Sequence, residues 1–137
     1  MRKIILTLTV FAIAIFLYSC EKDKLDIQEG TFKGTFTVTY SSGTLWGSGT
    51  QTGQTTLILK NGKYTCSGNS NRIPAGGSGT YSFDKGKITF NDENSWTADF
   101  DWNLILSGQY DYTFDGKKLK ISADKNIGNY NYDLEKQ

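Results

Sequence analysis

The sequence of 137 residues contains no histidine, only one proline and only two cysteines. Without histidine there is no imidazole to serve as general base, metal ligand or proton shuttle near neutral pH, so the common catalytic triads are excluded. Fifteen basic and fourteen acidic residues leave a formal net charge of +1. A nucleic-acid binder needs an excess of positive charge to neutralise phosphates, and this chain lacks it. The composition therefore argues against most enzyme mechanisms and against nucleic-acid partners.

The amino terminus has the pattern of a secretory signal peptide. Arg2 and Lys3 precede an almost unbroken apolar run from Ile4 to Leu17, which is shorter than the roughly 20 residues that span a bilayer. A charged segment follows this run at once, and it favours export over the alternative of a retained membrane helix. We predict that residues 1–19 are a signal peptide.

The apolar run ends in Leu17-Tyr18-Ser19-Cys20. Leu17, the small Ser19 and Cys20 resemble the lipobox of bacterial lipoproteins, whereas Tyr18 departs from the small residue usual at its position. The resemblance implies that Cys20 is acylated with fatty acids such as palmitate and begins the mature chain. The protein would then be an outer-membrane lipoprotein on the periplasmic or the cell-surface side, with residues 20–29 as a charged tether.

Acylation of Cys20 would leave Cys66 as the one remaining cysteine, so we expect no internal disulfide. Cys66 falls in an expected strand. We therefore interpret it as a small buried hydrophobe rather than as a reactive thiol.

From Thr31 onward, apolar and polar residues alternate, which is typical of strands with one buried face. The alternation recurs in segments that turn residues separate, and we expect eight strands. In the longest segment, apolar residues hold the even positions from Trp96 to Phe114, with Gly108 as an expected bend or bulge.

The expected connections alternate in length. Tight turns are predicted at Asn61-Gly62, Lys85-Gly86 and Asp115-Gly116, where glycine supplies the positive φ of a hairpin. The other connections are expected to be longer and span residues 41–54, 69–78, 91–95 and 124–128. In an up-and-down meander these four lie at one end of the sheet. Closure at eight strands removes exposed edges, so we predict an all-β, antiparallel up-and-down barrel over residues 30–137.

Three short segments resemble the lipocalin and lipocalin-like families. Gly30-Thr31-Phe32 is similar to the Gly-x-Trp opening of lipocalins, with Phe in place of Trp. The run 106–110, followed by 115–121, resembles the closing hairpin of small lipocalin-like lipoproteins. The resemblance covers residues 30–136 by pattern and implies a calycin-type barrel with a ligand site at its open end.

All tyrosines after the predicted signal peptide fall on the inward phase: Tyr40, Tyr64, Tyr81, Tyr110, Tyr112, Tyr130 and Tyr132. A buried phenol needs a hydrogen-bond partner, so the interior is expected to be amphipathic. Either these rings line a cavity for a small ligand, or they pack together and fill the barrel. Four of them, Tyr40, Tyr64, Tyr110 and Tyr112, are candidate ligand contacts.

Further candidate ligand contacts are Trp46, Arg72, Trp96 and Trp102. Trp46 lies in a glycine-rich loop and is expected either to cover the barrel mouth or to anchor its own loop. Arg72 is expected either to pair with a ligand carboxylate or to be solvated.

The carboxylates do not form a convincing active site. A general acid needs burial to raise its pKa. Five carboxylates are instead expected on the outward, solvated phase: Asp84, Asp99, Asp101, Asp111 and Asp133. The turn at residues 91–94 lacks the ligand spacing of a calcium loop. We predict no enzyme activity, no metal and no cofactor.

The sequence favours a monomeric, lipid-anchored, lipocalin-like protein that binds a small apolar or amphipathic ligand at the long-loop end. The alternative is an envelope interaction or inhibitor module that uses the barrel as a scaffold. Lys117, Lys118 and Lys120 cluster at the third tight turn, at the end that would face the anchor. They either attract anionic headgroups or keep the hairpin soluble.

Overall fold

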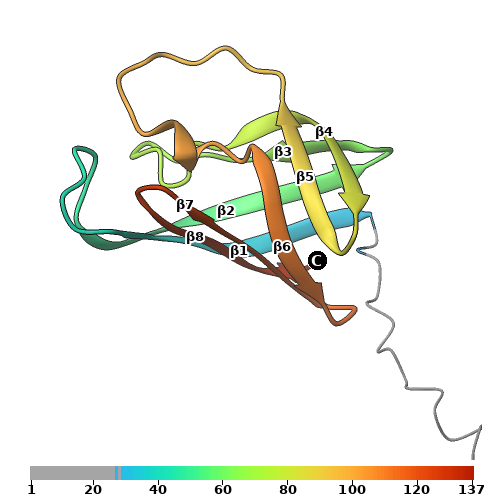
Figure 1. Ribbon diagram of the computed structural model, residues 1–137. Helices are drawn as coiled ribbons and strands as arrows, with labels where there is room; N and C mark the ends of the chain where they lie inside the picture. The colour runs from blue at the N-terminus through green and yellow to red at the C-terminus, as the bar shows by residue number, and fades with distance from the viewer. Residues whose placement is uncertain (1–26, 28) are drawn as a thin grey trace, which may run out of the picture.

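The computed structural model of the chain describes Ile27 and residues 29–137. The predicted signal peptide, Cys20 and most of the predicted tether lie outside the described residues. Within the described part, no helix has the length and apolar character needed to cross a membrane. Eight antiparallel strands form one sheet that closes on itself (Figure 1). The predicted all-β barrel is confirmed.

Each strand pairs with its neighbours in the chain, and β1 closes the barrel by pairing with β8. The strands are β1 (Gly30–Tyr40), β2 (Gly49–Lys60), β3 (Lys63–Cys66), β4 (Gly77–Asp84), β5 (Lys87–Asp92), β6 (Gly108–Phe114), β7 (Lys118–Lys125) and β8 (Gly128–Lys136).

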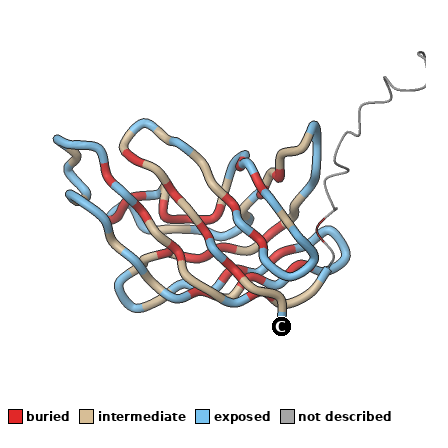
Figure 2. Tube along the Cα trace, turned by 90° about the horizontal axis from the view of Figure 1, so that it is seen from below, coloured by how far each residue is buried: buried red, intermediate tan, exposed pale blue. Residues whose placement is uncertain are grey.

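Alternation places one side of each strand in the core. In β1, Phe32, Phe36 and Val38 are fully buried, whereas Lys33 and Thr39 are exposed. Figure 2 shows this pattern as buried residues that recur between exposed ones along the barrel wall. Since side chains of a strand point to alternate faces, the apolar positions that share one phase turn inward together.

Tight turns and long loops lie at opposite ends of the barrel (Figure 1). The closed end carries the turns at Asn61-Gly62, Lys85-Gly86 and residues 115–117. The opposite end, here called the rim, carries loops 41–48, 67–76 and 93–107 and the turn at 126–127. The expected gathering of the odd-numbered connections at one end is therefore correct.

The expected strand from Trp96 to Phe114 is wrong in its first part. Residues 93–107 form an irregular loop with a short 3₁₀-helix, η2 (Trp102–Leu104), and β6 begins only at Gly108. The end of this loop forms backbone hydrogen bonds with loop 67–76, where Leu106 N donates to the Gly76 carbonyl oxygen. The alternation is misleading here, since apolar side chains in this loop are buried at the rim without belonging to a ladder.

The expected lengths of the other odd connections also need correction. The seventh is a two-residue turn, because the ladder between β7 and β8 continues to the pair Lys125 and Gly128. The first is shorter than expected, because polar residues 50–54 pair with β1 and belong to β2. The third spans residues 67–76, so the β3–β4 loop begins and ends two residues earlier than expected.

Aromatic rings cross the barrel interior in a continuous series. Ring centres lie 4.7 Å apart for Phe36 and Tyr132, and 6.3 Å apart for Tyr132 and Tyr110. The series continues through Phe90 to Tyr64, with separations of 5.9 and 4.8 Å. The inward rings therefore pack against one another, which is the second of the two arrangements that the sequence left open.

Candidate ligand site at the rim

Two adjoining hollows open at the rim, with volumes of about 440 and 370 Å³. Both are lined by Trp46, Phe100 and Asp101, so together they form one groove, here called the rim groove. The larger hollow extends toward loop 67–76, and the smaller one extends toward η2. The groove therefore lies where the three long loops meet above a filled barrel.

Loop 41–48 is seated on the barrel by a glycine. A Cβ atom on Gly47 would lie 2.7 Å from the Tyr40 ring and 2.8 Å from the Gln51 amide nitrogen, which is too close for a side chain. The neighbouring Trp46 is thereby held at the groove, with 48% of its surface exposed. Of the two roles expected for Trp46, the structure supports a place at the barrel mouth.

Loop 67–76 is held by a side chain of its own and by a second glycine. The Asn69 side-chain oxygen accepts hydrogen bonds from the backbone N–H groups of Asn71, at 3.1 Å, and of Ile73, at 2.9 Å. A Cβ atom on Gly53 of β2 would lie only 1.6 Å from the Ile73 carbonyl oxygen. The loop can lie against β2 only because this position is glycine.

Arg72 forms one wall of the groove. Its backbone φ of 56° is a left-handed conformation that non-glycine residues seldom adopt. Its Nη1 donates to Asp99 Oδ1 at 2.9 Å, and its guanidinium lies 4.5 Å from the centre of the Phe100 ring. Hydrogen bonds from Thr97 and from Arg72 lower the pKa of Asp99 to about 2. Arg72 thus has an internal carboxylate partner, so it is not simply solvated.

Asp101 forms the floor of the groove and is 4% exposed, so its expected place on a solvated outward face is wrong. Its Oδ2 accepts hydrogen bonds from the hydroxyls of Tyr130, at 2.9 Å, and Tyr40, at 3.3 Å. Its Oδ1 accepts from the backbone N and the Nδ2 of Asn103, both at 2.9 Å. The outward prediction failed because loop 93–107 is not a strand, and the period-2 rule does not apply to it.

Lys125 joins the end of β7 to the same loop. Its Nζ donates to the Tyr110 hydroxyl at 3.0 Å and lies 3.4 Å from the carbonyl oxygens of Asn103 and Ser107. It also lies 5.2 Å from the centre of the Tyr130 ring. Burial lowers the pKa of Lys125 to about 8, because removal from water disfavours the charged amine. The half-buried lysine thus ties loop 93–107 to the barrel.

The other two predicted tryptophans have different roles. Trp102 lies on η2, lines the smaller hollow and donates from Nε1 to the Thr97 carbonyl oxygen at 2.9 Å. Trp96 is half-buried and donates from Nε1 to Asp92 Oδ2 at 2.6 Å, while its ring meets Phe100 edge-on at 5.8 Å. Trp96 therefore packs against a groove residue without lining the larger or the smaller hollow.

Of the tyrosines proposed as ligand contacts, only Tyr40 lines the groove. Tyr64, Tyr110 and Tyr112 lie in the barrel interior, and the Tyr64 hydroxyl donates to the Leu106 carbonyl oxygen at 2.6 Å. Cys66 is buried as expected, and burial raises the pKa of its thiol to about 11.

The groove lining includes residues that the sequence interpretation missed, among them Gln51, Asn71, Phe100 and Asp101. One signal for Asp101 was present. An Asp followed two residues later by an amide that it caps is typical of a helix start, and Asp101 is the N-cap of η2. The alternating apolar residues on both sides of it hid this signal.

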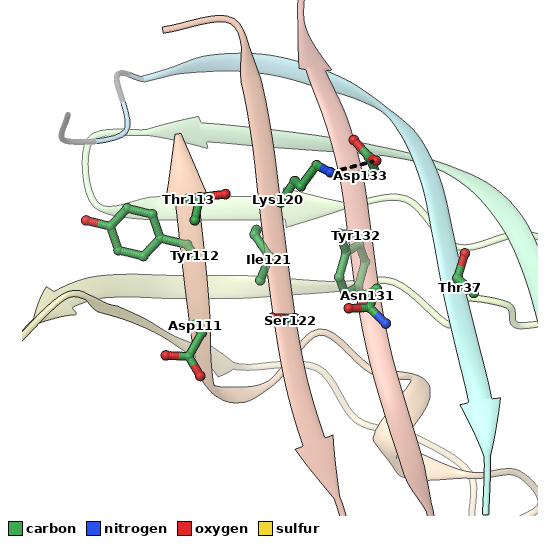
Figure 3. A pocket seen from close by; sticks show the side chains of 10 residues that line it. All are labelled: Thr37, Asp111, Tyr112, Thr113, Lys120, Ile121, Ser122, Asn131, Tyr132 and Asp133. Atoms are coloured by element: carbon green, nitrogen blue, oxygen red, sulfur yellow. Dashed lines mark ion pairs between the residues drawn. The ribbon is translucent and has the colours of Figure 1, made fainter. Parts of the chain in front are cut away.

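A hollow of about 530 Å³ lies outside the barrel wall, over β6, β7 and β8 (Figure 3). The Nζ of Lys120 lies 3.7 Å from Asp133 Oδ2 there, and both side chains are mostly exposed. All residues that line it belong to strands, so no adaptable loop encloses it. The rim groove, which three loops enclose, is the better candidate for a ligand site.

Comparison with protein-family models, with curated proteins and with solved structures finds no match to this chain. The closed eight-stranded barrel is consistent with a lipocalin-like barrel. In Ile27 and residues 29–137, no three acidic or cysteine side chains come together in a way that would hold a metal ion. The function has to be argued from the rim groove itself.

Proposed function

We propose that the protein is a membrane-anchored lipoprotein that binds a small, uncharged, amphipathic ligand across the rim groove. The observation that carries this proposal is the groove lining, which combines the aromatic side chains of Trp46 and Phe100 with the amides of Gln51 and Asn71. Small-molecule sites are typically concave, with apolar walls and a few polar groups that fix orientation. The proposal assigns binding, and no catalytic step, to the groove.

The charges of the groove support an uncharged ligand. Arg72 is paired with Asp99 at 2.9 Å, and Asp101 is buried with two hydrogen bonds to each carboxylate oxygen. A cationic ligand would have to displace the hydrogen-bond donors of the buried Asp101, which is costly. The Arg72–Asp99 pair is exposed and competes with an anionic ligand only weakly. The packed interior below supports a ligand that lies across the rim rather than inside the barrel.

Octyl glucoside, kept below the concentration at which it forms micelles, is a suitable uncharged amphipathic probe. We expect a saturable change in tryptophan fluorescence, because Trp46 is half exposed at the groove and would be covered. The variant Trp46→Ala should weaken binding about tenfold, the loss expected for roughly 1.4 kcal/mol of stacking and burial. Octanoate and octylamine, which carry a charge on the same chain, should bind more weakly.

Tyr81→Ala is the matched control, because Tyr81 is a half-buried aromatic residue of β4 that does not line the groove. Equal loss of octyl glucoside binding in Tyr81→Ala and Trp46→Ala would contradict the proposal. Native mass spectrometry of the protein purified from its own envelope would then show whether a natural small molecule accompanies it.

One observation favours a second function, a docking module for a partner protein. Leu45 at the tip of loop 41–48 is 96% exposed and the next residue, Trp46, is 48% exposed. Contiguous exposed apolar side chains are typical of interaction sites. In that case Leu45→Ser would abolish capture of the partner while leaving octyl glucoside binding intact. If Trp46→Ala loses both octyl glucoside binding and partner capture while Leu45→Ser keeps both, the small-ligand function is favoured.

The lipid anchor is tested separately, because Cys20 lies outside the described residues. Cells grown with labelled palmitate should incorporate the label into the parent chain and into Cys66→Ser, but not into Cys20→Ser. Cys20→Ser should also leave the membrane fraction. Label that persists in Cys20→Ser would overturn the lipoprotein assignment.

A further inference from the structure

Lysine side chains are concentrated at the closed end of the barrel. Each of its three tight turns is flanked by two of them: Lys60 and Lys63, Lys85 and Lys87, and Lys117 and Lys118. Lys136 belongs to the same end, because its backbone N–H donates to the Lys117 carbonyl oxygen at 2.8 Å. The acidic residues near these turns are fewer, namely Glu29, Asp84, Asp111, Asp115 and Glu135.

The rim has the opposite balance of charge. Its loops and the strand ends beside them carry Asp92, Glu93, Asp99, Asp101 and Asp124, against two cations, Arg72 and Lys125. Although the net charge of the chain is close to zero, the fold thus separates charge along the barrel. The closed end is positive and the rim is negative.

Several of these lysines are available to an external anion. Lys117 pairs with Glu135 at 2.5 Å, Lys87 with Asp111 at 2.8 Å, and Lys63 with Glu93 of the rim at 4.0 Å. Among the described residues, no acidic side chain lies within ion-pair distance of Lys60, Lys85 or Lys118. Each of the three turns therefore presents at least one lysine without an acidic partner in that part of the chain.

Exposed apolar side chains accompany the lysines. Ile58 of β2 is 42% exposed and Phe83 of β4 is 38% exposed, and each precedes a turn lysine by two residues. Lysines beside exposed aromatic and aliphatic side chains are typical of surfaces that lie at the headgroup level of a membrane.

The amino-terminal part of the described chain lies at this same end. Glu29 Oε1 accepts a hydrogen bond from the backbone N–H of Asn61, in the first tight turn, at 2.5 Å. The first strand also begins at this end, because Gly30 pairs with Leu59 beside the first tight turn (Figure 1).

We propose that the closed end is a docking surface for a bilayer that contains anionic lipids. The turn lysines contact the headgroups, and Phe83 and Ile58 reach into the interface between headgroups and acyl chains. The lysines stand on three separate turns around one end rather than along a groove, and no arginine of the described residues accompanies them. The arrangement therefore fits a flat anionic surface better than a nucleic-acid strand. The rim groove then faces away from the membrane.

The test uses the full chain with its own amino terminus, mixed with vesicles of phosphatidylcholine alone or with about one third phosphatidylglycerol. A water-soluble amine-acetylating reagent is added, and mass spectrometry follows acetylation of each lysine. We expect Lys60, Lys85 and Lys118 to react about threefold or more slowly with the anionic vesicles than with the neutral ones. Salt at about 1 M, which screens exposed charges beyond roughly 3 Å, should remove this protection.

Two variants with the same change in net charge separate position from total charge. The first replaces Lys60, Lys85 and Lys118 by glutamine, and should lose the protection of the neighbouring Lys63 and Lys117. The second introduces glutamate at three exposed rim positions, through Ser42→Glu, Ser48→Glu and Ser95→Glu, and should keep the protection of the closed-end lysines.

Three outcomes would overturn the proposal: equal acetylation with neutral and anionic vesicles, equal loss of protection in the two variants, or equally strong protection by single-stranded DNA at the same phosphate concentration. These results do not depend on the rim groove, since octyl glucoside binding is measured without vesicles. Failure of one proposal therefore leaves the other standing.

Discussion

The rim and the closed end of this barrel are stabilised in different ways. At the closed end, short turns continue the strand ladders, and the polar groups are exposed and individually weak. At the rim, long loops are held by a few buried polar contacts, above all those of Asp101 and Lys125. Because buried hydrogen-bonded charges are strongly destabilising when a partner is removed, single substitutions should act strongly at the rim and weakly at the closed end.

The largest expected effect is that of Asp101→Ala. This change leaves the hydroxyls of Tyr40 and Tyr130 and the Asn103 amide without their acceptor, and should lower the free energy of unfolding by about 3 kcal/mol. Asp115→Ala is the matched change at the closed end, where the carboxylate also accepts from two backbone N–H groups but is exposed. Urea unfolding should show a much smaller loss for Asp115→Ala, and similar losses would break the comparison.

Gly53→Ala tests how loop 67–76 is seated. A Cβ atom would lie 1.6 Å from the Ile73 carbonyl oxygen, so the loop has to move, at about 1–3 kcal/mol. Octyl glucoside binding should weaken as well, because Arg72 moves with the loop. Thr52→Ala, at the exposed neighbouring position of β2, should leave binding unchanged. Unaltered binding by Gly53→Ala would show that loop 67–76 takes no part in the site.

The pH dependence of stability should report on Lys125, whose pKa of about 8 in the folded protein lies below its ordinary value of 10.5. Between about pH 8 and pH 9 the unfolded chain binds more protons, so the free energy of unfolding should rise with pH, by about 1 kcal/mol. Above about pH 9 the rise should stop, because the Cys66 thiol loses its proton in the unfolded chain, whereas burial raises its pKa to about 11 in the folded protein. Above pH 10 the free energy of unfolding should fall, because burial raises the pKa of Tyr40 to about 12 and that of Tyr130 further, whereas tyrosines of the unfolded chain lose their protons.

Urea unfolding between pH 7 and pH 11 measures this profile. Lys125→Met should abolish the rise, and Lys85→Met, an exposed change at the closed end, should preserve it. A rise that survives in Lys125→Met would assign the effect to another group.

The smallest expected effects come from two buried phenols. The Tyr130 hydroxyl donates to Asp101, so Tyr130→Phe should destabilise the protein by about 1–2 kcal/mol. The Tyr132 hydroxyl is buried and has no hydrogen-bond partner among the described residues, so Tyr132→Phe should be neutral or slightly stabilising. Thermal unfolding of the two variants decides this, and equal losses would show that Tyr132 has a partner such as a buried water.

The closed end was more predictable from sequence than the rim, because its signals are local. Glycine in Asn61-Gly62 and Lys85-Gly86 marks a hairpin turn within a few residues, and both turns are present. The core phase of the strands followed from alternation in the same local way. The closed barrel then followed from the number of strands, because closure leaves no exposed sheet edges.

The rim depends on residues that are far apart in the chain. Asp101 is buried by Tyr40 and Tyr130, which lie 61 and 29 residues away, and no local pattern encodes that meeting. Phe100 and Leu104 are apolar because they are buried at the rim. Their spacing in the sequence nevertheless matches the alternation of a strand. The ring contacts also join residues that are far apart in the chain, because they cross the barrel. The sequence therefore could not decide whether the inward rings enclose a cavity or pack together.

The most direct test of the central claim, a binding groove on top of a filled barrel, is an NMR titration of the isotopically labelled protein with octyl glucoside. The account predicts saturable shifts of backbone amide signals in loops 41–48, 67–76 and 93–107, with little change at Phe90 and Tyr132 in the interior. Shifts centred on these interior residues, or no saturable shift at the rim, would contradict it.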